Sequence, residues 1–531
     1  MRALWSLVRV NFLNFVGTLQ KKKKGRYVGA ILMILFFLVF FGGSMSIQAV
    51  ATAYSLVIHY HLPNYAIFMG LTSALAISLL FGLMRATTAP TAKDADLLLS
   101  MPLRKSTVVL SKIMTQYLFD APLLIIMLLP TIIATFAFGG LTVFGLLRGI
   151  LVVMIMPVLS LTISLVFGYI FSFIRERVPG GSLILIGITM AILLGYIVLN
   201  MQMNTIFLKA AEMGSERTTL IIEKVLPIKH VTYFITDGGW VNLLGTIAII
   251  FAPFSIAVIL FASRYGRGNY QRRSKNHRLS FRVRPLGSTL LIHEAKKYFS
   301  SPLYVFNTAF GTVMLVAGTV AIMVMGPDKI MSFLGSDGDI PINLSPLQLA
   351  GGITIAIAFM AAMTITTASS ISFEGKKFWI LRSLPIRSGD ILASKLALSI
   401  VLFVPIQLIC SIAVALRLGL DPVESIGLML LPAALNMAVS GAGLISNLLL
   451  PKMKWQNEAE IVKQSLSVLL TVFLGFGLAA LPPVLYFTVF MRFGGITIGA
   501  FAVTGLFLLI FAVEFLILAT AGKKLFERIT E

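Results

Sequence analysis

Long apolar runs recur along the whole chain, and the short polar segments between them carry most of its charges. A transmembrane helix needs about 20 predominantly apolar residues, and twelve runs approach or exceed this length. The pattern therefore predicts an all-α, polytopic transmembrane helical protein with about 12 spans. The predicted spans are 28–51, 65–84, 117–138, 143–171, 183–203 and 241–262 in the first half, and 303–325, 349–371, 396–416, 425–450, 466–490 and 496–520 in the second.

The composition excludes a soluble protein. Of 531 residues, 58% are hydrophobic and 12% are charged, and the mean hydropathy is +0.94, whereas a soluble domain has about 25% charged residues. The single cysteine, Cys410, lies inside a predicted span, which excludes an internal disulfide and a multi-cysteine metal site. The lysine run at 21–24 precedes an apolar stretch too extended for a signal peptide, so we expect a retained first helix.

The net charge of +22 indicates the orientation of the chain rather than a nucleic-acid partner. If both termini are cytoplasmic, 35 of the 43 Lys and Arg residues fall on the cytoplasmic side, while Asp and Glu are spread almost evenly. This distribution is the positive-inside pattern of membrane proteins. We expect a multi-pass protein of a bacterial-type cell membrane, embedded in the lipid bilayer, with both termini cytoplasmic and no nucleic acid bound.

One short segment occurs twice, at residues 96–112 (DLLLSMPLRKSTVVLSK) and 379–395 (WILRSLPIRSGDILASK). We call these the first and second repeated elements; six of their 17 aligned positions are identical. Each copy lies between the second and third predicted spans of its half. The chain therefore divides into two pseudo-repeated six-helix halves: residues 1–262 with an interfacial helix over 1–20, a basic cytoplasmic linker over 263–289, and residues 290–531 with a second interfacial helix over 290–298.

The repeated elements have two interpretations. Basic residues beside a span are ordinary topology markers, and this accounts for Arg104 and Lys112. It does not account for proline and serine at matched positions in both halves. Since proline is favoured in the first turn of a helix, we expect Pro102 and Pro385 to begin short exposed helices that fit a groove in a partner. We favour this docking role.

Catalytic and cofactor signatures are missing from the sequence. No G-x-x-x-x-G-K-[ST] phosphate loop occurs, so this chain is not expected to be an enzyme, and any ATP hydrolysis must take place on another polypeptide. His59 and His61 flank a turn, where an interfacial pair is favoured over a metal site. Asp337 and Asp339, in GSDGD, are the one hint of an external carboxylate site. We expect no catalytic, cofactor-binding or metal-binding residue.

Three charged residues lie inside predicted spans, where an ionised group is costly. They are Asp120 in the third span, Arg148 in the fourth and Glu514 in the last. Each could line a substrate path or pair with another helix. We favour an interhelical or interfacial role for all three.

The repeated elements, the hexapeptide EGKKFW at 374–379 and the segment PKMKWQNEAEIVKQ at 451–464 together resemble the membrane subunits of ATP-binding-cassette (ABC) exporters with short cytoplasmic loops. The resemblance covers essentially the whole chain and implies two such subunits fused in one polypeptide. It also implies two copies of an ABC ATPase partner that binds ATP and Mg. The residues expected to couple to that ATPase are Pro102, Leu103, Arg104, Lys105 and Lys112 in the first half, and Lys376, Pro385, Ile386, Arg387, Lys395, Trp455 and Glu458 in the second. The short loop at 175–181 departs from its counterpart, so the two contacts need not be equivalent.

The expected function is that of a permease subunit that moves an amphipathic substrate, such as a peptide, lipid or drug, between the two halves. The main alternative is an ion-coupled secondary transporter of the major-facilitator kind, which also has six plus six spans. Against it, the loop between the second and third spans lacks that family's glycine and aspartate pattern. A lipid-linked transferase using Asp337 and Asp339 is the third alternative.

Overall fold

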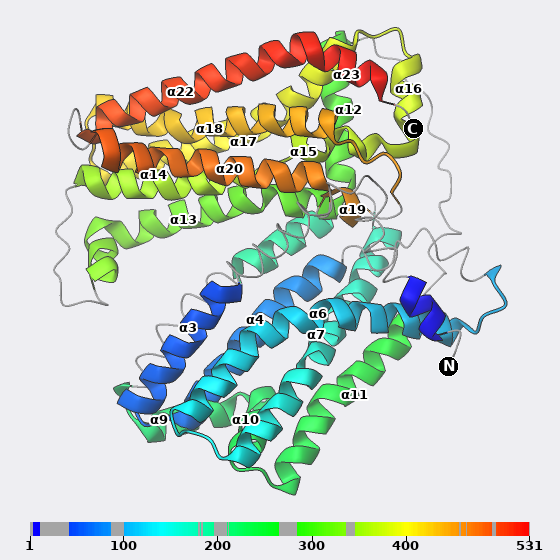
Figure 1. Cartoon of the computed structure of the whole chain (residues 1–531), viewed down its shortest axis with the longest axis vertical. Helices are drawn as coiled ribbons and strands as arrows, with labels where there is room; N and C mark the ends of the chain where they lie inside the picture. Colours follow the sequence, from blue (N-terminus) through cyan, green and yellow to red (C-terminus); the bar gives the residue numbers. More distant parts are fainter. Residues whose placement is uncertain are drawn as a thin grey trace. The chain divides into compact units, whose positions relative to one another are not determined.

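The computed structural model describes residues 4–10, 42–86, 100–178, 184–195, 212–264, 284–335, 346–455, 458–462, 465–490 and 495–529, with the single positions 181 and 210. All regular structure within these residues is helical (Figure 1). The chain forms two compact units: Met1–Gly181 with Ala191–Ser274, and Ser182–Met190 with Lys275–Glu531. We describe each unit by itself.

Eight of the described helices are long and apolar enough to cross a membrane. A bent pair, Lys105–Pro122 and Leu124–Ala137, provides a ninth if it counts as one span, and two shorter apolar helices cover Pro63–Leu79 and Ile184–Gly195. The eight are Val143–Phe171, Trp240–Ser263, Pro302–Gly326, Leu347–Ser383, Ser388–Leu418, Pro422–Leu449, Glu460–Phe490 and Gly495–Arg528. The predicted polytopic, all-helical membrane fold is confirmed.

The first unit contains both long and short helices within its described residues. The chain bends by 46° between Lys105–Pro122 and Leu124–Ala137. Pro122 explains this bend, because a proline has no backbone N–H to donate and its ring clashes with the preceding turn. The described elements are α3 (Gly43–Tyr54), η2 (Ser55–His59), α4 (Pro63–Ala86), α6 (Lys105–Ala137), α7 (Val143–Arg177), α9 (Ser215–Lys224), α10 (Leu226–Thr236) and α11 (Trp240–Arg264).

The second unit surrounds α18 (Pro422–Leu449), which has buried residues along most of its length. Small residues let neighbouring helices approach closely: a Cβ at Gly441 would overlap the carboxylate of Glu514, and one at Gly443 would overlap Thr367. The other elements are α12 (Leu286–Ser300), α13 (Pro302–Gly335), α14 (Pro346–Ala362), α15 (Thr367–Ser370), η4 (Ser372–Lys377), α16 (Phe378–Ser383), α17 (Ser388–Leu418), α19 (Ala459–Val462), α20 (Leu466–Leu485), η5 (Tyr486–Phe490), α22 (Gly495–Ile517), η6 (Leu518–Gly522) and α23 (Lys523–Arg528).

The two repeated elements have the same backbone. Arg104 and Arg387 are the N-cap residues of α6 and α17, with φ/ψ of −66°/133° and −66°/134°. The Leu103 amide donates to the Met101 carbonyl over 2.7 Å, and in the second copy the Ile386 amide donates to the Leu384 carbonyl over 2.8 Å. The duplication seen in the sequence is therefore also a duplication of local structure.

The short helices expected to begin at Pro102 and Pro385 do not form. Each proline lies in a turn, and the helix begins three residues later and runs without a separate exposed segment into the span. The helical region is sterically disfavoured for the residue before a proline, and Leu384 is accordingly extended, with ψ of 143°. In the second half, the short exposed helix is α16, which precedes Pro385.

The predicted span over 349–371 is interrupted after α14, and α18 and α13 supply hydrogen bonds to the irregular segment. Thr367 donates to the Ser440 carbonyl over 2.7 Å, and the Tyr304 hydroxyl donates to the Thr366 carbonyl over 2.6 Å. Non-helical backbone at membrane depth is tolerated only where neighbours satisfy it. The irregular residues end at α15, and η4, where the candidate site begins, follows α15 after one residue.

Candidate functional site

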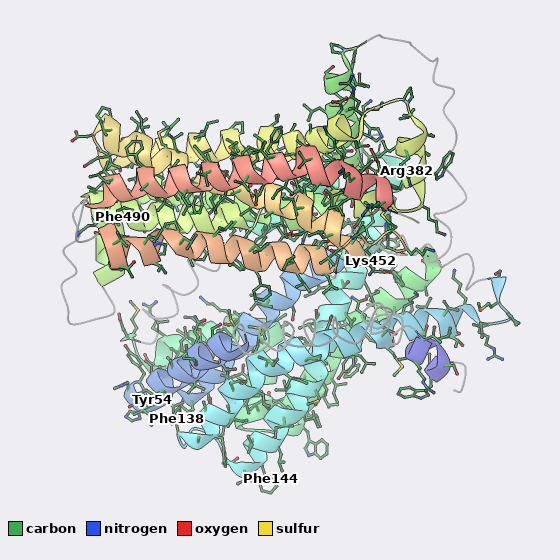
Figure 2. All side chains as sticks on the ribbon, turned by 45° about the horizontal axis from the view of Figure 1, so that its top comes forward. Tyr54, Phe138, Phe144, Arg382, Lys452 and Phe490 are labelled. Atoms are coloured by element: carbon green, nitrogen blue, oxygen red, sulfur yellow. The ribbon has the colours of Figure 1, made fainter. Side chains whose placement is uncertain are left out.

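Five segments of the second unit meet at one end of its helix bundle: α12, η4 with α16, the start of α17, the segment 451–462, and α23 (Figure 1). Figure 2 shows Arg382 and Lys452 at this end and Phe490 at the opposite end. Three of these segments carry the motifs on which the family resemblance rests. This end is therefore the candidate functional site.

The helix α12 turns an acid toward the unit. Its buried residues are Leu290, Glu294 and Tyr298, spaced four apart and hence on one face. The helix includes residues 290–298, over which the sequence predicted an interfacial helix; its interfacial position stays a prediction. Its inner face is apolar at both ends, with a carboxylate in the middle.

That carboxylate belongs to a charge cluster formed by Glu294, Lys297, Glu374 and Lys395. Lys395 Nζ lies 2.7 Å from Glu294 Oε1 and 2.8 Å from Glu374 Oε1. Lys297 Nζ lies 3.2 Å from Glu294 Oε2 and 2.5 Å from Glu374 Oε1. The Lys395 side chain has no exposed surface, and both lysines also donate to the Ser370 carbonyl. The cluster thus joins α12, η4 and α17.

The cluster buries no net charge because two lysines balance two glutamates. Burial alone would raise the pKa of Glu294, but the positive charges of Lys395 and Lys297 outweigh it and hold that pKa below its usual value. Burial, and next the charge of Lys395, lower the pKa of Lys297. Buried charges of this kind persist only when paired and hydrogen-bonded. We infer that the cluster holds α12, η4 and α17 together.

Ser372, the first residue of η4, is the centre of a second network. Asn447 Oδ1 accepts from the Ser372 amide (3.1 Å), and its Nδ2 donates to the Ser372 hydroxyl (2.8 Å). Trp455 Nε1 donates to the Ser372 carbonyl over 2.9 Å. Gly375 is required beside it, because its φ is +52° and a Cβ would lie 2.6 Å from Trp455 Nε1.

The segment 451–462 is also held against the unit. Ser301, directly after α12, donates to Glu458 Oε2 over 2.5 Å, and within the segment Lys452 forms a 3.1 Å ion pair with Glu460. Trp455 and Glu458 were both expected to meet the ATPase, and both make contacts within the second unit. Trp455 supports η4, and Glu458 holds the residue that follows α12.

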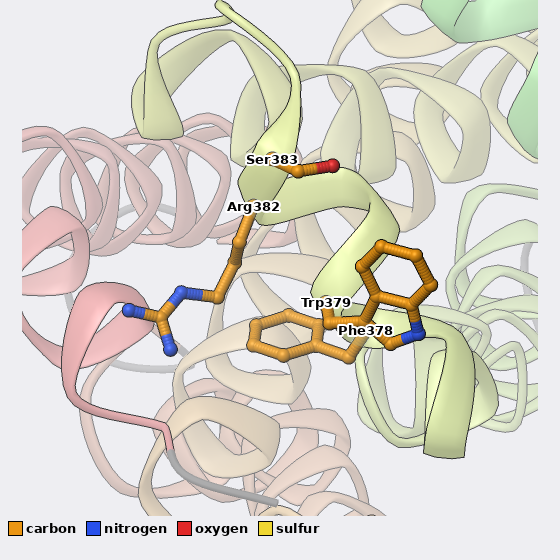
Figure 3. Close-up of a pocket in the computed structure, with 4 residues that line it drawn as sticks. All are labelled: Phe378, Trp379, Arg382 and Ser383. Atoms are coloured by element: carbon orange, nitrogen blue, oxygen red, sulfur yellow. The ribbon is translucent and has the colours of Figure 1, made fainter.

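The outer surface of this end is apolar at its centre and basic around it. Trp379 is 60% exposed, Ile380 43% and Leu384 44%, while Lys376 and Arg387 are exposed beside them. We call these five residues the docking face. Figure 3 shows an open pocket next to it, lined by Phe378, Trp379, Arg382 and Ser383.

In the first unit, the described part of the first repeated element presents a similar surface. Pro102, Arg104 and Lys105 are exposed, Leu103 and Lys112 are half-buried, and Met101, aligned with Leu384, is 41% exposed. In the second copy Pro385 is exposed and Ile386 half-buried. Lys395 differs from this outward set, since it is buried in the charge cluster.

The three charged residues of the predicted spans contact neighbouring helices or turns. Ser160 donates to Asp120 Oδ2 over 3.4 Å between α6 and α7. Arg148 Nη2 donates to the Thr236 carbonyl over 3.4 Å, and Glu514 packs against α18. Each contact joins elements within one unit.

Sequence reasoning missed Glu294, Lys297 and Glu374 as site residues. One signal was present: Glu294 is the single acid between residues 263 and 301, among ten Lys and Arg residues. Asp337 and Asp339 lie outside the described residues. Within the described residues, no group of three or more His, Cys, Asp and Glu side chains could hold a metal ion.

A family model described as "Membrane protein of 12 TMs" matches residues 340–514. The matched segment holds most of the second unit, including η4, α16 and the second repeated element. Comparisons with curated proteins and with solved structures gave no significant match. The chain is thus a multi-pass helical membrane protein similar, over this segment, to a 12-span membrane family.

Proposed function

We propose that this chain is the permease subunit of an ABC exporter, and that two copies of a separate ATPase dock on its two repeated elements. The observation that carries the proposal is the shared backbone of those elements, with Arg104 and Arg387 in the same N-cap conformation before a long helix. A partner that comes in two copies needs two similar surfaces. A duplication of the membrane helices alone would not require the turns before α6 and α17 to have the same backbone conformation.

The chemistry of the docking face supports a protein partner. An apolar centre around Trp379 gives binding energy, since aromatic residues dominate interface hot spots. The basic residues Lys376 and Arg387 at its edge favour an acidic rim on the partner and speed association. Amphipathic cargo remains an expectation from the sequence.

In this proposal, ATP binding draws the partner's two copies together and moves both docked elements. Movement of the second element enters α17 directly, because that helix begins at Ser388, next to Arg387. The charge cluster carries the same movement to α12, since Lys395 is on α17 and Glu294 is on α12. The chain itself supplies no nucleotide chemistry in this scheme.

The test is binding of the ATPase to the purified chain. The Walker-motif ATPase that copurifies with the tagged full-length chain is identified, expressed, and titrated onto wild type and the charge reversals Arg104→Glu and Arg387→Glu. We predict that each reversal weakens binding by about tenfold, the effect of losing one charge-assisted contact worth about 1.4 kcal/mol. Lys224→Glu, on the exposed surface of α9, is the matched control. Wild-type affinity in both reversals would overturn the proposal.

A further inference from the structure

The helix α23 is packed against α16 and the start of α17, which we call the docking segment, although the contacting residues lie 139 to 148 positions apart in the chain. Phe526 and Phe378 meet edge to face with ring centroids 5.0 Å apart, and both are buried. Arg382 Nη1 donates to the Ile529 carbonyl over 3.1 Å. At the start of α17, the Ser388 hydroxyl donates to Glu527 over 3.1 Å.

These contacts reach the surface on which a partner would rest. Phe378 and Arg382 are two of the four residues lining the pocket beside Trp379 (Figure 3). Phe378 fixes α16 from beneath, while the Arg382 guanidinium holds its last turn to the chain after α23. The orientation of α16 therefore depends on α23 as well as on η4.

On its other side, α23 continues into the last span. It follows η6 and α22 with no intervening loop, so a displacement of α23 moves the end of α22. The helix α22 in turn packs along α18, with Glu514 against Gly441 and Phe507 fully buried. These contacts and the continuous helix thus connect the docking segment through α23 to α22 and α18.

We propose that α23 is a second transmission route, which carries movement of the docking segment into the last span, and that Phe526 and Arg382 are positioning residues for this coupling. The role rests on the proposed function, because it assumes that a partner moves α16. It goes beyond it by joining the docking segment to α22 as well as to α17. If α23 only fixed its own position on the unit, it would not need to contact two residues of the pocket beside the docking face, Phe378 and Arg382.

Two variants test the route without relying on one that could fail to fold. Phe526→Leu keeps an apolar side chain but removes the ring pair, and Arg382→Gln removes the tether from an exposed position. Lys524→Ala, exposed on the same helix, is the matched control. Each variant is reconstituted as the full chain with the ATPase, and ATPase affinity and chain-stimulated ATP hydrolysis are measured.

A distance measurement then separates transmission from stability. Spin labels at Lys377→Cys near α16 and Leu509→Cys on α22, in a Cys410→Ser background, report whether the two segments move together when ATP and Mg²⁺ are added; both label sites are exposed. We expect one narrow distance in wild type and in Lys524→Ala, and a clearly broadened distribution in both test variants.

We also expect the stimulation of hydrolysis to fall about fivefold in Phe526→Leu, the equivalent of one aromatic pair worth about 1 kcal/mol, with ATPase affinity within about twofold of wild type. Arg382→Gln should lower the stimulation as well; because Arg382 lines the pocket beside the docking face, the distance distribution is the readout of transmission in this variant. Normal affinity with unchanged stimulation and unchanged distances in both variants would overturn the transmission role alone. If the wild-type chain binds no ATPase, the proposed function fails, and this role fails with it.

Discussion

Replacing Lys395 by methionine removes the centre of the charge cluster without changing the volume of the side chain greatly. Lys395 contacts both glutamates, at 2.7 Å and 2.8 Å, and is wholly buried. The variant leaves Glu294 and Glu374 with Lys297 alone, so one negative charge remains buried without compensation. Removing one partner of a buried ion pair costs about 3–5 kcal/mol, far more than the pair contributes relative to apolar residues.

Because the destabilisation comes from the uncompensated charge, removing one negative charge as well should restore part of the stability. In Lys395→Met with Glu374→Gln, the remaining pair Lys297 and Glu294 is again neutral. The double variant should therefore be more stable than the single one by about 1–3 kcal/mol, the range of coupling between residues in direct contact. Lys376→Met, an exposed lysine of the same loop, should change the unfolding free energy by at most about 0.5 kcal/mol.

The assay is the free energy of unfolding of the purified chain in mixed micelles, measured by titration with a denaturing detergent and followed by circular dichroism. The free energy of unfolding should decrease in the order wild type, double variant, Lys395→Met, with Lys376→Met close to wild type. If Lys395→Met is as stable as Lys376→Met, or if adding Glu374→Gln destabilises it further, then the cluster is not a balanced buried joint.

Three further predictions concern the same end of the second unit. Folding lowers the pKa of Glu294. The ionised Glu294 should therefore stabilise the folded chain by a constant amount above its unfolded pKa of about 4.3, and this contribution should be lost as pH falls through the lower folded pKa. The difference in unfolding free energy between wild type and Glu294→Gln, followed from pH 7 to pH 3, measures this contribution. Gly375→Ala should lower the free energy of unfolding by about 1–3 kcal/mol, because the φ of Gly375 is +52° and Trp455 blocks a Cβ. Gly352→Ala, with open space in α14, should be neutral or stabilising by up to about 1 kcal/mol, and an equal loss of stability in both variants would contradict this prediction. Asn447→Leu removes the side-chain oxygen that accepts from the buried amides of Ile371 and Ser372. Hydrogen exchange of these amides should quicken by at least about tenfold, the effect of losing about 1.4 kcal/mol. Unchanged exchange would contradict this prediction.

Most of the fold follows from the sequence because spanning a bilayer imposes a strong constraint on composition and length. The alignment of Arg104 with Arg387 also foretold a shared local structure, and the matched N-cap angles confirm it. The error at Pro102 and Pro385 came from treating proline as a helix start, when its effect on the preceding residue favours a turn.

The charge cluster could not be predicted from pattern alone. Glu294 and Glu374 lie 80 residues apart, and nothing in their local sequence brings them to one lysine. Lys395 was expected to couple to the ATPase because it aligns with Lys112 in the repeated element. Only the packing of α12 across the end of α17 reveals that this lysine is internal.

If two ATPase copies dock on the two matched elements, the complex contains two ATPase subunits for each copy of this chain. Native mass spectrometry of the full-length chain, purified in mild detergent with its ATPase, should give one chain with two ATPase copies, falling to one copy in either Arg104→Glu or Arg387→Glu. A chain that carries no ATPase, and that moves substrate in vesicles with a proton gradient alone, would contradict it.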